Sequence, residues 1–346
     1  MSRPARDRVA RRGAAALCVL GALVAFVLVG AAEESTPLAA EPAPLAAHGL
    51  LIAIATAGER LVAVGDRGII VHSDDQGRNW VQASVVPTRA LLTGVCFFDA
   101  RRGIAVGHDE VILATADAGD TWTRTHYAPE AERPLLDVMC GPPTQAIAVG
   151  AYATYLTSND AGDSWSARTF QASPPPKGRA GRPAAAESGG FHLNRIVAAS
   201  DTRFYLAGEA GHLYRSDNGG VIWQELSSPY EGSFFGVLPL GGESVLAFGM
   251  RGNLYRSDDL GGNWQKIDTG TVAMLNGAAR LDASGVAIVG LSGVVLVSRD
   301  GGRNFTLAQQ TDRSGLSAVV RVGMDPAEIA VVGESGARLI SLKGSP

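Results

Sequence analysis

Acidic side chains that recur at a fixed spacing are the first candidates for chemistry. Six stretches of the 346-residue chain follow the frame Ser-x-Asp-x-Gly-x-x-Trp, with small variations. Their third and eighth positions are Asp75 and Trp80, Asp117 and Trp122, Asp160 and Trp165, Asn218 and Trp223, Asp259 and Trp264, and Asp300 and Phe305. A short carboxylate or amide in a tight turn accepts backbone N–H hydrogen bonds, and the ring can anchor the turn to a sheet. The frame therefore predicts a structural turn and does not require catalysis.

The other reactive side chains do not support a metal, a cofactor or a catalytic residue. The acidic turns lack the spacing and terminal glutamate of a calcium loop, and the six histidines form no metal-binding motif. Serines 292 and 335 lie between glycines, but the closing glycine of a nucleophile elbow is missing. A sialidase would need a tyrosine nucleophile beside a glutamate, and no tyrosine has an evident glutamate partner in the sequence. We therefore predict a protein that is not an enzyme and has no metal or cofactor.

Five arginines form a second candidate set: Arg67, Arg89, Arg133, Arg251 and Arg313. Three of them precede an apolar segment by the same step: Arg89 before Leu92, Arg133 before Leu136 and Arg313 before Leu316. The other two lie in turns after a glycine. Guanidinium groups bind carboxylates and are common at interface hot spots, so we expect these arginines to bind a protein partner. The alternative interpretation is ordinary solvated surface charge.

The segments between the frames predict how these residues are positioned. Each copy contains a short apolar strand that ends in glycine, at Gly65, Gly107, Gly150, Gly208, Gly249, Gly290 and Gly333. The steps between these glycines are 42, 43, 58, 41, 41 and 43 residues. A period in the low forties with four strands per repeat is typical of a propeller blade. The sequence thus predicts an all-β, seven-bladed β-propeller over residues 48–346, with the acidic hairpins on one rim and the five arginines on the opposite face.

From about residue 50 to the C-terminus the chain resembles the Asp-box (BNR-type) propellers, and more narrowly the photosystem II stability/assembly factor-like family. The resemblance rests on the small-x-Val-Gly strands and the Ser-x-Asp-x-Gly-x-x-Trp hairpins described above. It implies a non-catalytic binding scaffold, or an assembly or stability factor for a membrane protein complex. The alternative functions are a sialidase-like glycoside hydrolase and a carbohydrate-binding propeller.

The ends of the predicted propeller carry further signals. Residues 1–32 join an arginine-rich start to an apolar stretch with a small-residue ending, which predicts a secretory signal peptide or an uncleaved anchor. We therefore expect a periplasmic or other extracytoplasmic protein whose partner is a membrane protein on that side. Residues 33–47 are expected to form a linker, part of which, near residues 44–47, would supply the missing fourth strand of the seventh blade and close the ring. Residues 171–190 are rich in proline, glycine and alanine and predict a flexible insertion.

Charge and cysteine content restrict the remaining possibilities. The net charge is −4, and the chain without residues 1–32 has a net charge of −8, which argues against nucleic-acid binding. Cys96 and Cys140 lie four residues after Leu92 and Leu136, and the sequence predicts matching positions on neighbouring innermost strands. An exported protein permits a disulfide, but an apolar strand favours free cysteines that pack as small hydrophobic residues. We expect free thiols here.

Overall fold

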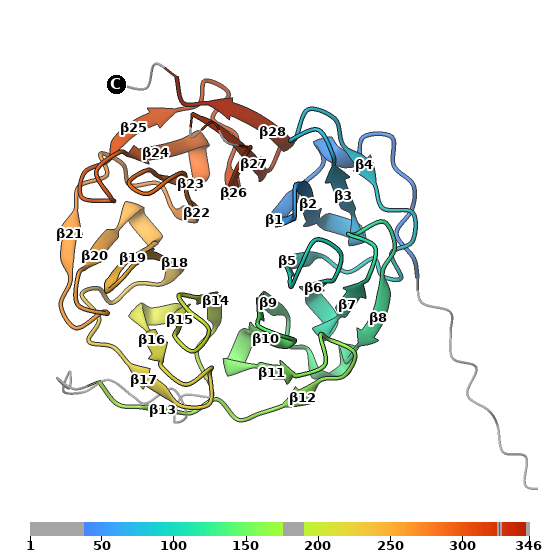
Figure 1. Cartoon of the computed structure of the whole chain (residues 1–346), viewed down its shortest axis with the longest axis horizontal. Helices are drawn as coiled ribbons and strands as arrows, with labels where there is room; N and C mark the ends of the chain where they lie inside the picture. Colours follow the sequence, from blue (N-terminus) through green and yellow to red (C-terminus); the bar gives the residue numbers. More distant parts are fainter. Residues whose placement is uncertain (1–37, 176–189, 324, 326, 344–346) are drawn as a thin grey trace, which may run out of the picture. The chain divides into compact units, whose positions relative to one another are not determined.

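Seven β-sheets surround a central channel in the computed structural model (Figure 1), which describes residues 38–175, 190–323, 325 and 327–343. The all-β, seven-bladed propeller predicted from the sequence is confirmed. The innermost strands of the seven blades are β1 (Leu51–Ala57), β5 (Leu92–Phe97), β9 (Leu135–Gly141), β14 (Leu193–Ala198), β18 (Phe234–Gly241), β22 (Leu275–Arg280) and β26 (Leu316–Arg321). The second strands are β2 (Arg60–Gly65), β6 (Gly103–Gly107), β10 (Gln145–Gly150), β15 (Phe204–Gly208), β19 (Ser244–Gly249), β23 (Val286–Gly290) and β27 (Glu328–Gly333).

The outer part of each blade holds the shorter strands. The third strands are β3 (Ile70–Ser73), β7 (Ile112–Thr115), β11 (Tyr155–Ser158), β16 (Leu213–Ser216), β20 (Leu254–Ser257), β24 (Val294–Ser298) and β28 (Gly336–Ser341). The fourth strands are β4 (Val81–Gln82), β8 (Thr123–His126), β12 (Ser166–Ala167), β17 (Trp223–Glu225), β21 (Gln265–Ile267) and β25 (Thr306–Gln309). Single 3-10 turns join the second and third strands of blades one to six: η2 (Asp66–Gly68), η3 (His108–Glu110), η5 (Ala151–Ala153), η6 (Glu209–Gly211), η7 (Met250–Gly252) and η8 (Leu291–Gly293). The other 3-10 turns are η1 (Ala46–His48) and η4 (Pro129–Ala131).

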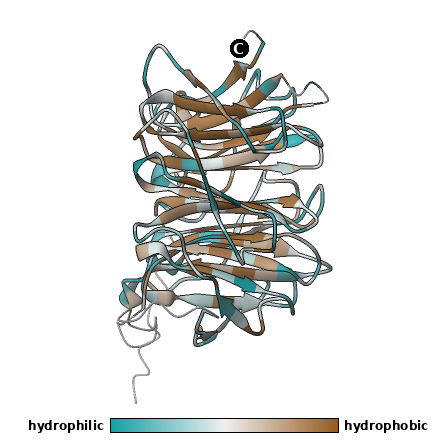
Figure 2. Cartoon of the chain, turned by 90° about the vertical axis from the view of Figure 1, so that its left-hand side faces the viewer, coloured by the Kyte–Doolittle hydropathy of each residue, from teal (hydrophilic) through white to brown (hydrophobic). Residues whose placement is uncertain are grey.

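The apolar second strands build the core because each is covered on both faces by a neighbouring blade. All five residues of β6, β15 and β23 are buried, and their sequences are continuous runs of small or branched apolar residues. A strand buried on both faces does not alternate polar and apolar residues. Figure 2 shows apolar residues concentrated along the strands and polar residues at the turns. The hydrophobic clusters accordingly lie between adjacent blades.

The glycine that ends each second strand is required by a close backbone approach. A Cβ atom built on Gly65 would lie 2.1 Å from the carbonyl oxygen of Leu50, which precedes the innermost strand of the same blade. Equivalent contacts occur at Gly107, Gly150 and Gly290, with 2.2, 2.3 and 2.1 Å to the corresponding carbonyl oxygens. The repeated glycine therefore lets the second strand approach the entry of the first.

The predicted closing strand is wrong. Among the described residues blade seven has three strands, and residues 38–50 form the 3-10 turn η1 and no strand. Residues 33–37 of the predicted linker lie outside the described residues. The backbone N–H of Ala40 donates to Val86 O (2.9 Å), and that of Ala43 donates to the Gln82 side chain (2.8 Å). These bonds attach the segment to blade one and the chain that follows it. The neighbouring Pro44 has no N–H to offer to a sheet.

The predicted insertion is partly ordered. Residues Ala172–Ser173 form β13, which pairs in parallel with β17 and makes blade four a five-stranded sheet. The rest of the predicted flexible stretch, at residues 176–189, lies outside the described residues, as does the predicted signal peptide at residues 1–32. In the part of the chain that the structure describes, no helix has the length and apolar character needed to cross a bilayer.

The prediction of free cysteines is also wrong, because Cys96 and Cys140 form a disulfide that joins blades two and three. The register explains the error. Leu135, and not Leu136, begins β9, since it pairs with Gly150 as Leu92 pairs with Gly107. Cys140 is therefore one residue out of register with Cys96. Neighbouring residues of a strand point to opposite faces, so this offset turns the two thiols toward each other. Truly equivalent positions would both face the same way around the ring.

Candidate functional site

The six motif turns, which we define as residues 73–80, 115–122, 158–165, 216–223, 257–264 and 298–305, join the third and fourth strands. In the first, the Ser73 hydroxyl donates to Asp75 Oδ1 (2.8 Å) and accepts the N–H of Gly77 (2.8 Å). Asp75 also accepts the backbone N–H (2.8 Å) and the side-chain amide (2.6 Å) of Asn79. These hydrogen bonds from Asn79 lower the pKa of Asp75 to about 2. The Trp80 indole donates to Gly77 O (3.1 Å), so both the carboxylate and the ring are bonded within their own turn.

The other motif turns repeat this pattern with local changes. The third-position oxygen accepts the N–H of the residue four positions later at Asp117–Thr121 (3.0 Å), Asp160–Ser164 (3.0 Å), Asn218–Ile222 (2.9 Å), Asp259–Asn263 (2.8 Å) and Asp300–Asn304 (3.0 Å). Of the rings, Trp122 and Trp223 are buried, and Trp165, Trp264 and Phe305 are half-buried. An acid whose oxygens are occupied in this way is poorly placed to transfer protons to a substrate.

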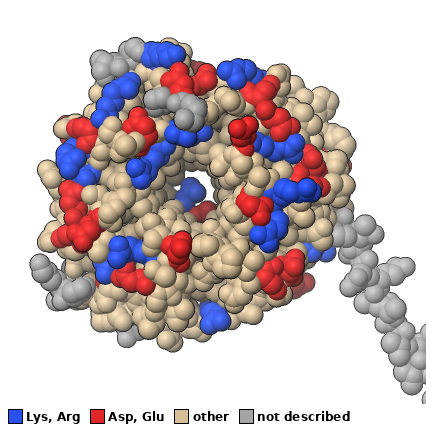
Figure 3. All heavy atoms as spheres, viewed as in Figure 1, with Lys and Arg blue, Asp and Glu red and all other residues tan. Residues whose placement is uncertain are grey.

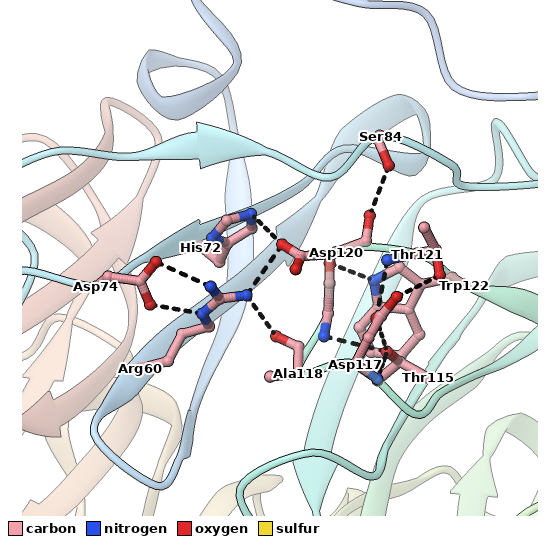
Figure 4. A network of polar contacts seen from close by, with 11 residues as sticks. Arg60, His72, Asp74, Ser84, Thr115, Asp117, Ala118, Asp120, Thr121 and Trp122 are labelled. Carbon is pink, nitrogen blue, oxygen red and sulfur yellow. Dashed lines mark hydrogen bonds and ion pairs between the residues drawn. The ribbon is translucent and has the colours of Figure 1, made fainter.

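Arginine links connect neighbouring motif turns across blade boundaries. Arg60, at the start of β2, binds Asp74 in its own blade (2.6 Å) and Asp120 in the turn of blade two (3.0 Å), as Figure 4 shows. The His72 ring nitrogen Nε2 contacts the same Asp120 carboxylate (3.0 Å). Burial lowers the pKa of His72, which favours the neutral ring. The network therefore locks two blades together at the motif rim.

The five predicted arginines are all exposed, on the face opposite the motif turns. Arg67 and Arg251 lie at the centres of η2 and η7, and Arg89, Arg133 and Arg313 lie in the connections that lead into β5, β9 and β26. They are spread around the ring and are not gathered into one site. The predicted common register does not include Arg133, which stands two residues before Leu135.

Two of the five have acidic neighbours. Arg89 binds Glu41 (2.6 Å) and Ala39 O (2.9 Å), which holds the N-terminal segment, and Arg67 lies 3.5 Å from Asp66. The remaining three, Arg133, Arg251 and Arg313, have no ion pair with any described residue.

A cavity of 780 Å³ in the central channel was not anticipated from the sequence. Its walls come from the innermost strands of blades one, four, five, six and seven. Three arginines, Arg195, Arg280 and Arg321, line it, and Glu59 is the one carboxylate among its described lining residues. Figure 3 shows basic side chains at the edge of the central opening and inside it. The cavity therefore concentrates positive charge in a concave site.

Arg280 and Arg321 occupy the same position in blades six and seven. Each is the last residue of its innermost strand, five residues after the buried leucine that begins it. The corresponding residues of the other blades are Thr56, Phe97, Cys140, Ala198 and Pro239. The equivalent positions of the innermost strands in the sequence carry the signal for this pair of arginines, whereas the turns do not.

The third arginine is tied to an ion pair between blades. Arg195 lies 3.5 Å from Asp137, which is 4% exposed and also accepts the N–H of Ile196 (2.9 Å). Burial raises the pKa of Asp137 despite the opposing effect of Arg195. In contrast, Arg321 donates to Leu281 O (3.1 Å), and Arg280 has no hydrogen bond to any described residue. Both are exposed, so these two guanidinium groups are the ones available to a ligand.

Other candidate chemistry is not assembled in the structure. Within the described residues, no group of three or more histidine, cysteine, aspartate or glutamate side chains could hold a metal ion. Tyr214 and Tyr255 are 1% and 7% exposed and pack in the clusters beside blade four and between blades four and five.

Comparison with known proteins confirms the resemblance predicted from the sequence. The family described as Photosynthesis system II assembly factor YCF48 matches residues 128–285. Among solved structures, YCF48 bound to a D1 peptide superposes with a TM-score of 0.66 at 15% identity, covering 89% of this chain and 97% of that one. YCF48 from Cyanidioschyzon merolae gives 0.65 at 17% identity, covering 86% and 96%. No curated protein matches the sequence.

The same fold also occurs in enzymes. A GH74 xyloglucanase from Xanthomonas campestris superposes with a TM-score of 0.67 at 14% identity, covering 89% of this chain and 54% of the enzyme. Identities this low establish a shared propeller fold and do not carry a shared activity.

Proposed function

We propose that this propeller is a non-catalytic scaffold that binds a segment of a membrane protein complex, as an assembly or stability factor. The observation that carries the proposal is the convergence of Arg195, Arg280 and Arg321 on one cavity, with Arg280 and Arg321 exposed. The similarity to the YCF48 family supports the scaffold function, and a YCF48 protein has been solved with a D1 peptide bound.

The positive charge of the cavity indicates the charge of the client segment that would bind there. A guanidinium group offers a planar fork of donors that matches a carboxylate, and a concave, partly desolvated site strengthens the pairing. An acidic segment or a chain terminus of the client would therefore fit between Arg280 and Arg321. Glu59, the one acid among the described lining residues, would repel a client carboxylate that approaches it, so the acidic segment is expected to face the arginines.

An extracytoplasmic location belongs to the same proposal. Structural disulfides persist in oxidising compartments, and Cys96 and Cys140 form one here. The expected export signal at residues 1–32 agrees with this. The client would then expose its acidic segment on the outer side of the inner membrane.

The glycoside hydrolase alternative has weaker support. Hydrolysis of a glycosidic bond commonly uses two carboxylates on opposite sides of the bond. The cavity contains Glu59 and no second acid among its described residues. Arginine-rich walls favour an anionic segment over a neutral sugar.

The test is capture of the client by the full-length protein from detergent-solubilised membranes of the producing organism. Arg280→Glu with Arg321→Glu should abolish enrichment of a membrane protein while leaving the circular dichroism spectrum and melting temperature unchanged. The matched control is Arg133→Glu with Arg251→Glu, which places two charge reversals on the opposite face. If the control variant still captures the client while the cavity variant does not, the cavity is supported as the client-binding site.

Two results would overturn this assignment. If the control pair abolishes capture and the cavity pair does not, the client docks on the face predicted from the sequence. If the wild-type protein enriches no membrane protein and instead releases sugar from a glycan panel, the scaffold function itself is wrong.

A further inference from the structure

Blade seven has an open outer edge. Six sheets of the propeller contain four or five strands, and the sheet β26-β27-β28 contains three. In blades one to six a fourth strand covers the third, whereas no described strand covers β28. Figure 1 shows β28 at the rim, next to blade one. An uncovered strand presents unpaired N–H and C=O groups that can bind another strand.

The register of β28 identifies the free groups. The N–H of Leu342 donates to Ala327 O (2.7 Å) on the side of β27, and the paired strands are antiparallel. Since backbone groups alternate in direction along a strand, Arg338 and Ile340 also bond toward β27. Ala337 and Leu339 therefore direct their backbone groups outward, and no described residue makes a backbone hydrogen bond to them.

A groove of 630 Å³ lies beside this edge. Its lining includes Ala337 and Leu339 of β28 and Asn79 and Trp80 of the first motif turn. The N-terminal segment lines it as well, through Ala43, Pro44 and the turn η1. The groove thus combines open backbone groups with a partly apolar surface, which is the arrangement that strand addition uses.

Blade four shows that a sheet of this propeller can take up a strand from outside its blade. There β13, which comes from the connection between blades three and four, pairs in parallel with β17 through Ala172–Trp223 and Ser173–Gln224. Residues 38–50 do not do the same for blade seven. The turn η1 packs against β28, with Ala46 in the same hydrophobic cluster as Ala337 and Leu339, but no backbone hydrogen bond joins this segment to β28.

We propose that the outer edge of β28 accepts an extended segment of a partner polypeptide as a fourth strand. Small or aliphatic side chains of this segment would face Leu339 and Trp80. At least one carboxylate would face Arg78, whose side chain is 57% exposed. Its Nη1 donates to Asp75 O (2.9 Å), and its Nη2 lies 3.9 Å from the carboxylate of Glu328, so the guanidinium keeps free donors. This docking edge is separate from the central cavity and does not depend on the function proposed for it.

The test uses a defined probe, a fluorescent peptide of about nine residues in which valine and glutamate alternate. Amide hydrogen exchange of the full-length protein is measured with and without the peptide. The expected result is fast exchange at Ala337 and Leu339 in the free protein and slow exchange at both in the complex. Two peptides methylated on alternate backbone nitrogens provide the register control, and one of them should lose binding while the other retains it.

Protein variants provide a second measurement. Ala337→Pro removes an outward N–H that bonds to no described residue, and it should weaken peptide binding about tenfold. Ala337→Gly keeps the N–H and should bind like the wild type. The methylated peptides still decide the question if the proline variant does not fold.

Three outcomes would overturn the proposal. Slow exchange at Ala337 and Leu339 without peptide would mean that another segment of this chain already covers the edge. Equal effects of the two methylation patterns would exclude strand pairing. Protection at another blade, with β28 unchanged, would place the peptide elsewhere.

Discussion

Replacing Trp122 by alanine tests the contribution of a motif turn to the stability of the ring. Trp122 is 2% exposed and packs in the cluster between blades one and two, with its ring edge-on to Phe97 at 6.3 Å. An aromatic side chain of this size buries about 150–250 Å², which at about 25 cal/mol per Å² corresponds to about 4–6 kcal/mol. Partial collapse of the cavity reduces this, and measured losses for such truncations are about 3–5 kcal/mol. We expect Trp122→Ala to lower the free energy of unfolding by about 4 kcal/mol.

The variant Trp122→Phe distinguishes the stability contributed by packing of the ring from the stability contributed by its hydrogen bond. The indole donates to Gly119 O at 3.0 Å, and phenylalanine fills most of the same space without that donor. The expected loss is about 1–2 kcal/mol, which is the usual cost of a hydrogen bond with a small packing defect. Trp80→Ala is the position control, since that ring is half-buried and should cost less than Trp122→Ala.

The assay is urea unfolding followed by far-UV circular dichroism, because tryptophan fluorescence changes with the substitution itself. The slope of the free energy of unfolding against urea concentration should be unchanged if the variants differ only in stability. A loss below about 1 kcal/mol for Trp122→Ala, or equal losses for the alanine and phenylalanine variants, would contradict the view that the ring anchors the turn.

Three further predictions concern charge and covalent links. The pKa of Asp75 is lowered to about 2, so the ionised carboxylate stabilises the fold at pH values above the usual carboxyl pKa. The melting temperature should therefore fall as the pH decreases from about 4 toward 2. The variant Asp75→Asn should show a smaller fall, and an unchanged pH profile would refute the assignment. Asp137→Ala should cost about 3 kcal/mol because it leaves Arg195 without its partner between the blades, and Arg195→Met in the same chain should restore part of that loss in urea unfolding. Reducing the disulfide between Cys96 and Cys140, which are 44 residues apart, should lower the free energy of unfolding by about 4 kcal/mol, because the unfolded chain gains the entropy of the released loop. The measurement is the urea midpoint, which should fall when reductant is added. A variant with both cysteines replaced by alanine should not respond to reductant.

The fold was predictable because its signals are local and repeated. The glycines at the ends of the second strands recur at a nearly constant step, and each motif turn carries its own hydrogen-bonding residues within eight positions. Small apolar runs such as Ala105–Val106 report burial on both faces without any knowledge of the neighbour. Repetition therefore substitutes for long-range information in this chain.

The errors arose where one residue of register or one distant contact decided the result. Cys140 lies five residues after Leu135, the first residue of β9, whereas Cys96 lies four residues after Leu92, the first residue of β5. This offset of one residue turns the two thiols toward each other, and they form a disulfide. The N-terminal segment is hydrogen-bonded to Gln82 and Val86. No local sequence pattern indicates that it binds these residues and not the edge of β28. Arg280 and Arg321 end their strands at the same position, but two of seven repeats are too few to form a repeated pattern in the sequence.

Local sequence was enough to predict a ring of seven small sheets with aromatic-anchored turns, since a strand, its glycine and its hairpin are all specified within one repeat. The tertiary structure alone decided which charges meet in the central cavity, which cysteines pair and which sheet edge stays open. These features depend on how residues of different blades face one another, and the closed ring sets that geometry through the packing of every blade against its neighbours.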